Sequence, residues 1–328
     1  MTEIRRRRLL LGLSSASLLA SKAWAQAPGG TQRICWLSAA ALRTESYNLA
    51  FIDQMRKQGF VEGKNLQINF RTAEGRVERL PPLAAELSRV GCDAFLSTGS
   101  EANLNAIKKV AGSVPIVMAA IDYDPVERGH IASLARPGGT ITGVHQLQTA
   151  LAEKRIEVLR ELLPKSKLVG VLADIATADT LKATLAAAKR YGFELHVHEF
   201  RRTPYDFDAA FAEFARAKVE AVIPLPSGFF VPARKEIPAL ALRYRLPTVF
   251  NNYLWTEAGG LLSYGTNLSE MYRRAADQMV KVLKGANPSE IPVEQPTVVE
   301  LVINMKTAKA LGLTIPQGVW FRAERIIE

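Results

Sequence analysis

Ala94-Phe95-Leu96-Ser97-Thr98-Gly99-Ser100-Glu101-Ala102-Asn103 is the stretch of this 328-residue chain that decides its fold class. A short apolar run leads into Ser-Thr-Gly-Ser, and Ala102, Ile107 and Val110 then recur at helical spacing. The pattern predicts a buried strand, a tight loop and the first turns of a helix. Because the free N–H groups of a helix N-terminus carry partial positive charge, we expect this loop to bind a carboxylate or another anion.

The same strand–loop–helix pattern repeats along the chain and restarts at a seam near residues 145–150. Strands are expected at residues 33–38, 66–70, 94–98, 115–118 and 141–144, and then at 168–173, 194–199, 221–225, 247–250 and 260–263. Strands that alternate with helices indicate parallel sheets covered on both faces. We therefore expect an α/β protein with two doubly wound parallel-sheet lobes. A helix at 268–284 and a strand at 297–303 are expected to complete both lobes.

The first 25 residues have the features of an export signal. Arg5 to Arg8 precede an apolar run that begins at Leu9, and Ala23-Trp24-Ala25 is a small-x-small cleavage pattern. The signal suits a twin-arginine or a Sec route. Cleavage after Ala25 would remove five basic residues and one acidic residue, and the net charge would fall from +10 to +6.

Signatures of catalysis and of nucleic-acid binding are missing from the sequence. There is no G-x-G-x-x-G after a strand, no G-x-x-x-x-G-K-[ST], and no G-x-S-x-G beyond residue 25. There is also no zinc-finger pattern or basic arm, so no nucleic-acid partner is expected. His196 and His198 share one face of a strand and could pair on a metal, but no third ligand is near in sequence and a surface-facing strand is preferred. We expect no catalytic residue, no cofactor and no metal.

Two cysteines, Cys35 and Cys92, each precede or open an apolar, strand-like run. Free buried thiols are the expected state at such positions. A disulfide is the alternative, since an exported protein can oxidise two cysteines of one sheet.

Small and polar residues stand where the expected strands end. Ligands of open parallel sheets bind at these carboxyl ends, and two lobes that face each other form a cleft that can close by hinge motion. The predicted ligand-binding residues are Ser38, Thr98, Gly99, Ser100, Asp122, Asp174, Ile175, Ala176, Thr177, Ser227, Gly228, Asn251, Tyr253 and Tyr264.

Sequence motifs spread over the whole mature chain match one known family. They are Gly59-Phe60-Val61-Glu62-Gly63-Lys64-Asn65-Leu66, Ala73-Glu74-Gly75-Arg76, Arg136-Pro137-Gly138-Gly139-Thr140-Ile141-Thr142-Gly143, Ala258-Gly259-Gly260-Leu261, Pro292-Val293-Glu294-Gln295-Pro296-Thr297 and Lys306-Thr307-Ala308-Lys309-Ala310-Leu311-Gly312. With them, the chain resembles the substrate-binding proteins of ABC transporters of the tryptophan/tyrosine-uptake type. The resemblance implies a type I periplasmic-binding-protein fold with a three-strand hinge, crossing near 145–148, 264–268 and 292–297. The implied domains are 1–25 as the cleaved signal, 26–146 plus 266–293 as lobe 1, and 147–265 plus 294–328 as lobe 2.

The resemblance also implies how an amino-acid ligand would be held. Its carboxylate would meet the loops at residues 98–100 and 175–177, and its ammonium an acidic residue after the strand expected to end at Pro226. This chain has Ser227 there, so the counter-ion is missing unless Asp122 or Asp174 replaces it. An unpaired buried ammonium is costly, which leaves a plain carboxylate or an amide compound open.

The resulting hypothesis is a monomeric periplasmic solute-binding protein. It would capture a small carboxylate-bearing or aromatic, amino-acid-like ligand and deliver it to an ABC permease and ATPase complex. The alternatives are a ligand-sensing module that acts through a separate signalling partner, and an enzyme on a two-lobed α/β scaffold.

Overall fold

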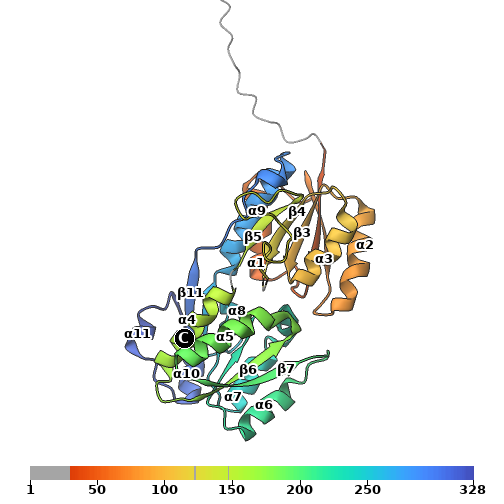
Figure 1. Cartoon of the computed structure of the whole chain (residues 1–328). Helices are drawn as coiled ribbons and strands as arrows, with labels where there is room; N and C mark the ends of the chain where they lie inside the picture. The colour runs from red at the N-terminus through yellow and green to blue at the C-terminus, as the bar shows by residue number, and fades with distance from the viewer. Residues whose placement is uncertain (1–29, 122, 147) are drawn as a thin grey trace, which may run out of the picture.

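The computed structural model describes residues 30–121, 123–146 and 148–328, so the predicted export signal and Asp122 lie outside the described residues. Figure 1 shows two α/β lobes, one above the other, with the chain passing between them. Among the described helices, none is long and apolar enough to cross a membrane.

The first lobe is built on a five-stranded parallel sheet in the order β2-β1-β3-β4-β5. Helices α1 and α9 cover one face, and α2 and α3 cover the other. The elements are β1 (Gln32–Ser38), α1 (Ser46–Lys57), β2 (Leu66–Thr72), α2 (Leu80–Val90), β3 (Ala94–Gly99), α3 (Glu101–Ala111), β4 (Ile116–Ala120), β5 (Ile141–His145) and α9 (Leu268–Leu283).

The second lobe carries two smaller sheets that lie edge to edge. Their orders are β7-β6-β8 and β12-β11-β10-β9, and one isolated bridge between Val222 and Thr248 connects them. The strands are β6 (Leu168–Asp174), β7 (Glu194–Phe200), β8 (Ala221–Pro224), β9 (Val249–Phe250), β10 (Leu262–Thr266), β11 (Val299–Asn304) and β12 (Arg325–Ile327). The helices are α4 (Gln148–Leu162), α5 (Ala178–Arg190), α6 (Phe207–Arg216), α7 (Glu236–Arg243), α8 (Tyr253–Glu257), α10 (Met305–Leu311) and α11 (Gln317–Trp320), with short 3-10 turns η2 (Ile175–Thr177) and η3 (Gly228–Ala233).

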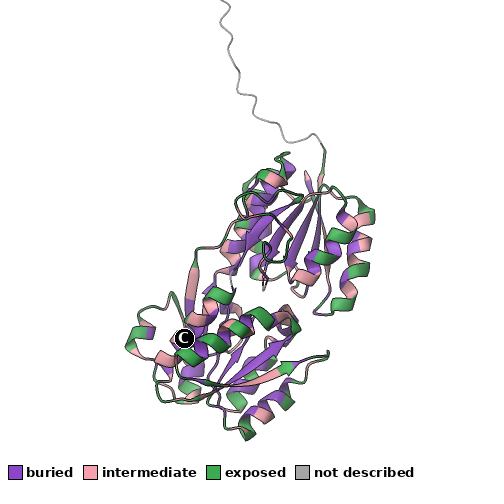
Figure 2. Ribbon diagram, viewed as in Figure 1, coloured by how far each residue is buried: buried purple, intermediate pink, exposed green. Residues whose placement is uncertain are grey.

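The predicted α/β class with two sheet-based lobes is confirmed, with one departure from parallel pairing. Strands β10 and β11 run antiparallel, because the chain turns back from α9 before it enters β11. Strand β12 was not predicted, since three residues carry too little of a period-2 pattern to be recognised. Figure 2 shows the sheets buried in both lobes and the exposed residues on the outer faces of the helices.

The chain passes between the lobes three times. It does so from β5 to α4, from β10 to α9, and from the turn at Pro288–Glu290 to β11. Glu294 still pairs with Val144 at the edge of the first sheet, so the third passage begins beyond it. The passages bring the carboxyl ends of the strands of both lobes to the same space between them (Figure 1).

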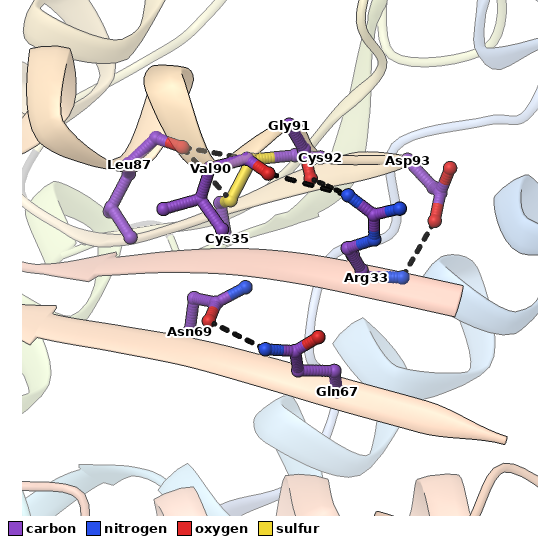
Figure 3. Close-up of a disulfide and its surroundings, with 9 residues drawn as sticks. All are labelled: Arg33, Cys35, Gln67, Asn69, Leu87, Val90, Gly91, Cys92 and Asp93. Carbon is purple, nitrogen blue, oxygen red and sulfur yellow. Dashed lines mark hydrogen bonds between the residues drawn. A yellow bond between two sulfur atoms is a disulfide. The ribbon is translucent and has the colours of Figure 1, made fainter. Parts of the chain in front are cut away.

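The two cysteines form a disulfide, which corrects the expectation of free thiols. Cys35 lies in β1 and Cys92 in the turn before β3, with 5.7 Å between their Cα atoms. Pairing of β1 with β3 brings these positions together, a distance that sequence alone does not contain. Figure 3 shows both sulfur atoms beside the carbonyl oxygen of Leu87, 3.4 Å from each. On the same side, the N–H of Arg33 donates to Asp93 at 2.6 Å and closes the turn.

Candidate functional site

A cavity between the lobes is the strongest candidate site; we call it the main cavity. About 710 Å³ of space lies within it, part of which is open solvent. Its walls come from loops at the carboxyl ends of strands in both lobes and from α1, η3, α8 and the start of α9. The lining residues are Ser38, Ala39, Ala40, Ala41, Tyr47, Thr98, Gly99, Ile121, Gln146, Pro226, Ser227, Gly228, Val231, Arg234, Asn251, Asn252, Leu254, Trp255, Leu268 and Tyr272.

The first-lobe wall depends on a close approach of two loops. Gly99 has φ +108°, and a Cβ at this position would stand 3.1 Å from the Cβ of Ala39. Glycine is the residue that adopts this backbone without strain. Beside it, the buried Thr98 hydroxyl accepts a hydrogen bond from Nε1 of Trp36 at 3.0 Å. The predicted strand–loop–helix is confirmed here as β3, Ser100 as N-cap, and α3.

Aromatic side chains form a large part of the wall. Tyr47 and Tyr272 meet edge to face with ring centroids 4.7 Å apart, and Trp255 stacks on Phe250 at 5.0 Å. Burial raises the pKa of both tyrosine hydroxyls, so both remain protonated and can donate hydrogen bonds. A ligand with a flat apolar body fits such a wall.

The second-lobe wall is stabilised by a carboxylate that stands behind it. Ser227 donates its hydroxyl hydrogen to Asp174 and accepts from the N–H of Phe229 at 3.0 Å. Asp174 also accepts from Tyr205 at 3.3 Å and from the N–H of Ala176 at 3.0 Å. Burial raises the pKa of this carboxyl group, although these hydrogen bonds oppose the rise. Asp174 therefore supports the Ser227 turn from outside the main cavity.

One ion pair joins the lobes beside the main cavity. Arg234, from the second lobe, donates Nη1 to Oε2 of Glu45 at 2.8 Å and Nη2 to Oε1 at 3.1 Å. The side chains are only 26% and 13% exposed. Burial lowers the pKa of Arg234, but the bonds to Glu45 outweigh this effect and the pKa is raised. The two-point geometry fixes both side chains and lies across the cleft.

Gln146 supplies the main cavity with an unsatisfied amide. The residue is 1% exposed, and neither Nε2 nor Oε1 has a hydrogen-bond partner. Its backbone is satisfied, since its N–H donates to Ala120 at 3.0 Å and its carbonyl accepts from Gln148 at 3.1 Å. Buried polar groups without partners are uncommon and mark places where another molecule can bind.

A second cavity of about 730 Å³ lies at the same interface and is more charged. Its lining includes Ser100, Glu101, Arg128, Ile175 and Asp179. Arg128 donates to Asp179 across the lobes at 2.7 Å, and both side chains are about half exposed. The bond to Asp179 raises the pKa of Arg128. The Ser100 hydroxyl is buried and has no partner.

The structure places the predicted ligand-binding residues in three groups. Six line the main cavity: Ser38, Thr98, Gly99, Ser227, Gly228 and Asn251. Ser100, Ile175 and Ala176 line the second cavity. Asp174, Thr177, Tyr253 and Tyr264 line neither, and Asp122 lies outside the described residues.

The four residues outside both cavities have other contacts. Thr177 is buried in a reciprocal capping box with Asp174. Tyr253 places its hydroxyl 2.8 Å from Ser46 and 3.3 Å from Ser269. Tyr264 packs against the core of the second lobe. These positions follow the expected strand ends, but helix caps and core packing determine where their side chains lie.

Several lining residues were not predicted from the sequence. Tyr47, Arg234 and Tyr272 come from helices or turns, and no local pattern distinguishes them from core or surface residues. Gln146 did have a signal, because it directly follows a predicted strand inside an expected crossover. Trp255, on α8, also lines the main cavity.

The two histidine side chains on β7 both form hydrogen bonds with one carboxylate. His196 Nε2 and His198 Nδ1 each lie 2.7 Å from an oxygen of Glu213 on α6. These bonds lower the pKa of Glu213. Within residues 30–121, 123–146 and 148–328, no group of three or more His, Cys, Asp or Glu side chains is arranged to hold a metal ion.

Comparison with protein families gives a match over residues 43–327 to the model described as ABC transporter substrate binding protein. The chain belongs to the ABC transporter substrate-binding protein family. The resemblance inferred from the motifs is confirmed, and family and fold point to a solute-binding protein rather than an enzyme.

Among curated proteins, a tyrosine-binding protein of Clostridioides difficile (strain R20291) is 24% identical over 269 residues, 80% of this chain and 75% of that protein. Among solved structures, a conserved domain protein of Vibrio cholerae has a TM-score of 0.82 at 24% identity, covering 90% of this chain and 99% of that one. An ABC domain from Streptococcus pneumonia in complex with L-Trp has a TM-score of 0.81 at 23% identity, covering 91% and 100%. At these identities the structural matches establish a shared fold.

Proposed function

We propose that this protein is exported to the periplasm, closes on a small aromatic or carboxylate-bearing ligand in the main cavity, and delivers it to an ABC permease. Family membership and the relatives that bind tyrosine and tryptophan support the transport role and the aromatic ligand. The signal-like first 25 residues support export. No catalytic step is part of this proposal.

The proposed lobes are residues 26–146 with 266–293 and residues 147–265 with 294–328. Closure would be a hinge motion at the three passages between them. Contacts that span the cleft, such as Arg234 with Glu45 and Arg128 with Asp179, would form on closing and break on opening. Ligand release to the permease would then follow opening.

One observation carries this proposal: an aromatic-walled cavity lies between the lobes, at the carboxyl ends of strands β1, β3 and β4. An interlobe position lets a bound ligand contact both lobes at once. Binding there favours the closed arrangement, because the contacts to the opposite lobe exist only in that state.

The proposal can be tested by thermal melting of the purified protein with amino acids, aromatic acids and aromatic amides. A ligand that binds only the folded state raises the melting temperature. Binding should disappear in Gly228→Leu, because the space next to Gly228 is open and the new side chain would occupy the cavity. Gly318→Leu is the matched control on the exposed side of α11, where an added Cβ also meets nothing. If no compound shifts the melt, the proposed ligand class is wrong.

A further inference from the structure

We infer that Gln146 recognises a ligand group that presents a hydrogen-bond donor and an acceptor side by side, as in a carboxamide or a lactam on an aromatic body. The inference rests on the proposed function and narrows its ligand class. It distinguishes this protein's ligand from a zwitterionic α-amino acid.

The side-chain amide of Gln146 is buried and has no partner for either of its polar atoms. Gln146 is 1% exposed, and both its Nε2 and its Oε1 lack partners. Leaving a buried donor and acceptor unpaired costs free energy at each atom, so a bound molecule that satisfies both gains at two points. A carboxamide or lactam supplies one N–H and one C=O in a single plane, which matches the side-chain amide of glutamine.

A ligand carboxylate or ammonium group matches the side-chain amide of Gln146 less well than a ligand amide does. A carboxylate has only acceptors, so it can pair with Nε2 but leaves Oε1 facing negative charge. An ammonium has only donors and leaves Nε2 unpaired. A neutral group with both functions satisfies the whole side chain without burying a charge, whereas a zwitterion could do so only by burying both of its charged groups.

The charged side chains near the main cavity already have partners within the protein. Two N–H donors of Arg234 bind both carboxylate oxygens of Glu45, so the positive charge of this cation is already paired and a ligand carboxylate would compete with Glu45 for it. Asp174 is turned toward Ser227 and Tyr205, behind the wall. Among the described lining residues none is acidic, so the described wall offers an ammonium no counter-ion.

The remaining wall of the main cavity is aromatic or uncharged and polar. Tyr47, Tyr272 and Trp255 offer aromatic surface, and the polar groups of Ser38, Asn251 and Asn252 are uncharged. Such a wall favours a flat, neutral molecule. Gln146 borders a neighbouring polar cavity as well, together with His145 and Gln148, so water in that cavity is the competing partner for its amide.

The test is isothermal titration calorimetry with compounds that differ only in the polar group. Indole-3-acetamide is compared with indole-3-acetate and L-tryptophan, benzamide with benzoate, and quinolin-2-one serves as the lactam. For the unmodified protein we expect at least one of the two carboxamides to bind about tenfold or more tighter than its matching acid, and indole-3-acetamide to bind tighter than L-tryptophan. Indole-3-acetate binding that equals or exceeds indole-3-acetamide binding, with the same result for the benzoate pair, would overturn the inference and leave the proposed function standing.

Two glutamine-to-glutamate variants test whether Gln146 is the residue that binds the amide group of the ligand. Gln146→Glu should weaken binding of the amide about tenfold, because it keeps the side-chain shape but replaces the donor that pairs with the ligand carbonyl by a second acceptor. Gln148→Glu is the matched control: it also removes an unpartnered Nε2 but keeps the acceptor that binds Arg155, outside the main cavity. An affinity for the amide that is unchanged in Gln146→Glu would show that water satisfies Gln146, and the inference fails.

Failure of the proposed function gives a different result. In that case none of these compounds, nor any other in the melting panel, binds the unmodified protein, and the two proposals fall together. Circular dichroism melts of both variants establish that they are folded before affinities are compared.

Discussion

The main cavity and the second cavity lie at the same interface between the lobes, but they differ in chemistry. The main cavity has aromatic walls and an ion pair, Glu45 with Arg234, whose side chains are 13% and 26% exposed. The second cavity has charged walls and the pair Arg128 with Asp179, at 45% and 50%. Both pairs connect the lobes, and only the first is shielded from water.

Because of this difference, we expect the polar loops at the two cavities to contribute unequally to ligand binding and closure. Solvent-exposed ion pairs contribute little free energy, because water and salt screen them and the side chains lose entropy. A shielded pair interacts more strongly, and losing one partner leaves a charge poorly solvated. We therefore expect ligand binding and closure to depend on the main cavity, and the second cavity to contribute little to either.

The largest expected effect concerns the disulfide, which joins β1 to the turn before β3. Strand β3 ends with Thr98 and Gly99 at the main cavity, and Ser100 follows at the second. Replacing Cys35 and Cys92 together by Ala should lower the free energy of unfolding by about 2–5 kcal/mol, because the disulfide closes a loop across 57 residues. Denaturant unfolding measures this, and reduction of the unmodified protein should give a similar loss. An unchanged midpoint in both experiments would show that the disulfide does not stabilise this wall.

The next effect tests the shielded ion pair. Glu45→Gln should shift the equilibrium from closed toward open by about 2 kcal/mol, roughly thirtyfold, because Arg234 keeps its charge without a partner of opposite sign. Small-angle X-ray scattering should show a larger radius of gyration than in the unmodified protein. Equal radii would mean that this pair does not hold the lobes together.

A smaller effect concerns the carboxylate behind the second-lobe wall. Burial raises the pKa of Asp174, so the folded protein keeps this proton to higher pH than the unfolded chain does. The free energy of unfolding contributed by this group therefore falls as pH rises from about 4 through the raised pKa. Asp174→Asn removes that dependence. The variant should match the unmodified protein near pH 3 and become more stable than it as the pH rises through the raised pKa.

Thermal melts of both proteins across this pH range check the prediction. The Asn side chain can still accept from the N–H of Ala176, so the turn is preserved. A stability difference that stays constant with pH would show that Asp174 ionises at its ordinary pKa in the folded protein.

The smallest effect is expected at the exposed ion pair. Arg128→Gln should change the balance of closed and open states by less than about 1 kcal/mol, because both side chains are about half exposed. Scattering curves should superimpose on those of the unmodified protein at physiological salt. An opening as large as that of Glu45→Gln would remove the distinction between the two cavities.

The local sequence was sufficient to predict the helices and strands, but not to predict all the residues that line the main cavity. Apolar runs and caps predicted β3 and α3 closely, because strand and helix periods are local properties. Strand ends located parts of both walls of the main cavity, Ser38, Thr98 and Gly99 in the first lobe and Ser227 in the second. Arg234 and Tyr272 were missed because they reach the cavity from other elements, and nothing in their neighbourhoods distinguishes them.

The sequence by itself determined the α/β class, the repetition of the pattern about a seam, the family, and the edge of the sheets that borders the interlobe cavities. These follow from hydrophobic period, turn residues and ordered motifs, all of which are read along the chain. The tertiary structure alone decided that Cys35 bonds to Cys92, that Asp174 stands behind the wall, and that Gln146 is left unpaired beside aromatic rings. Those outcomes depend on distances between elements far apart in sequence, and packing of the two lobes determines such distances.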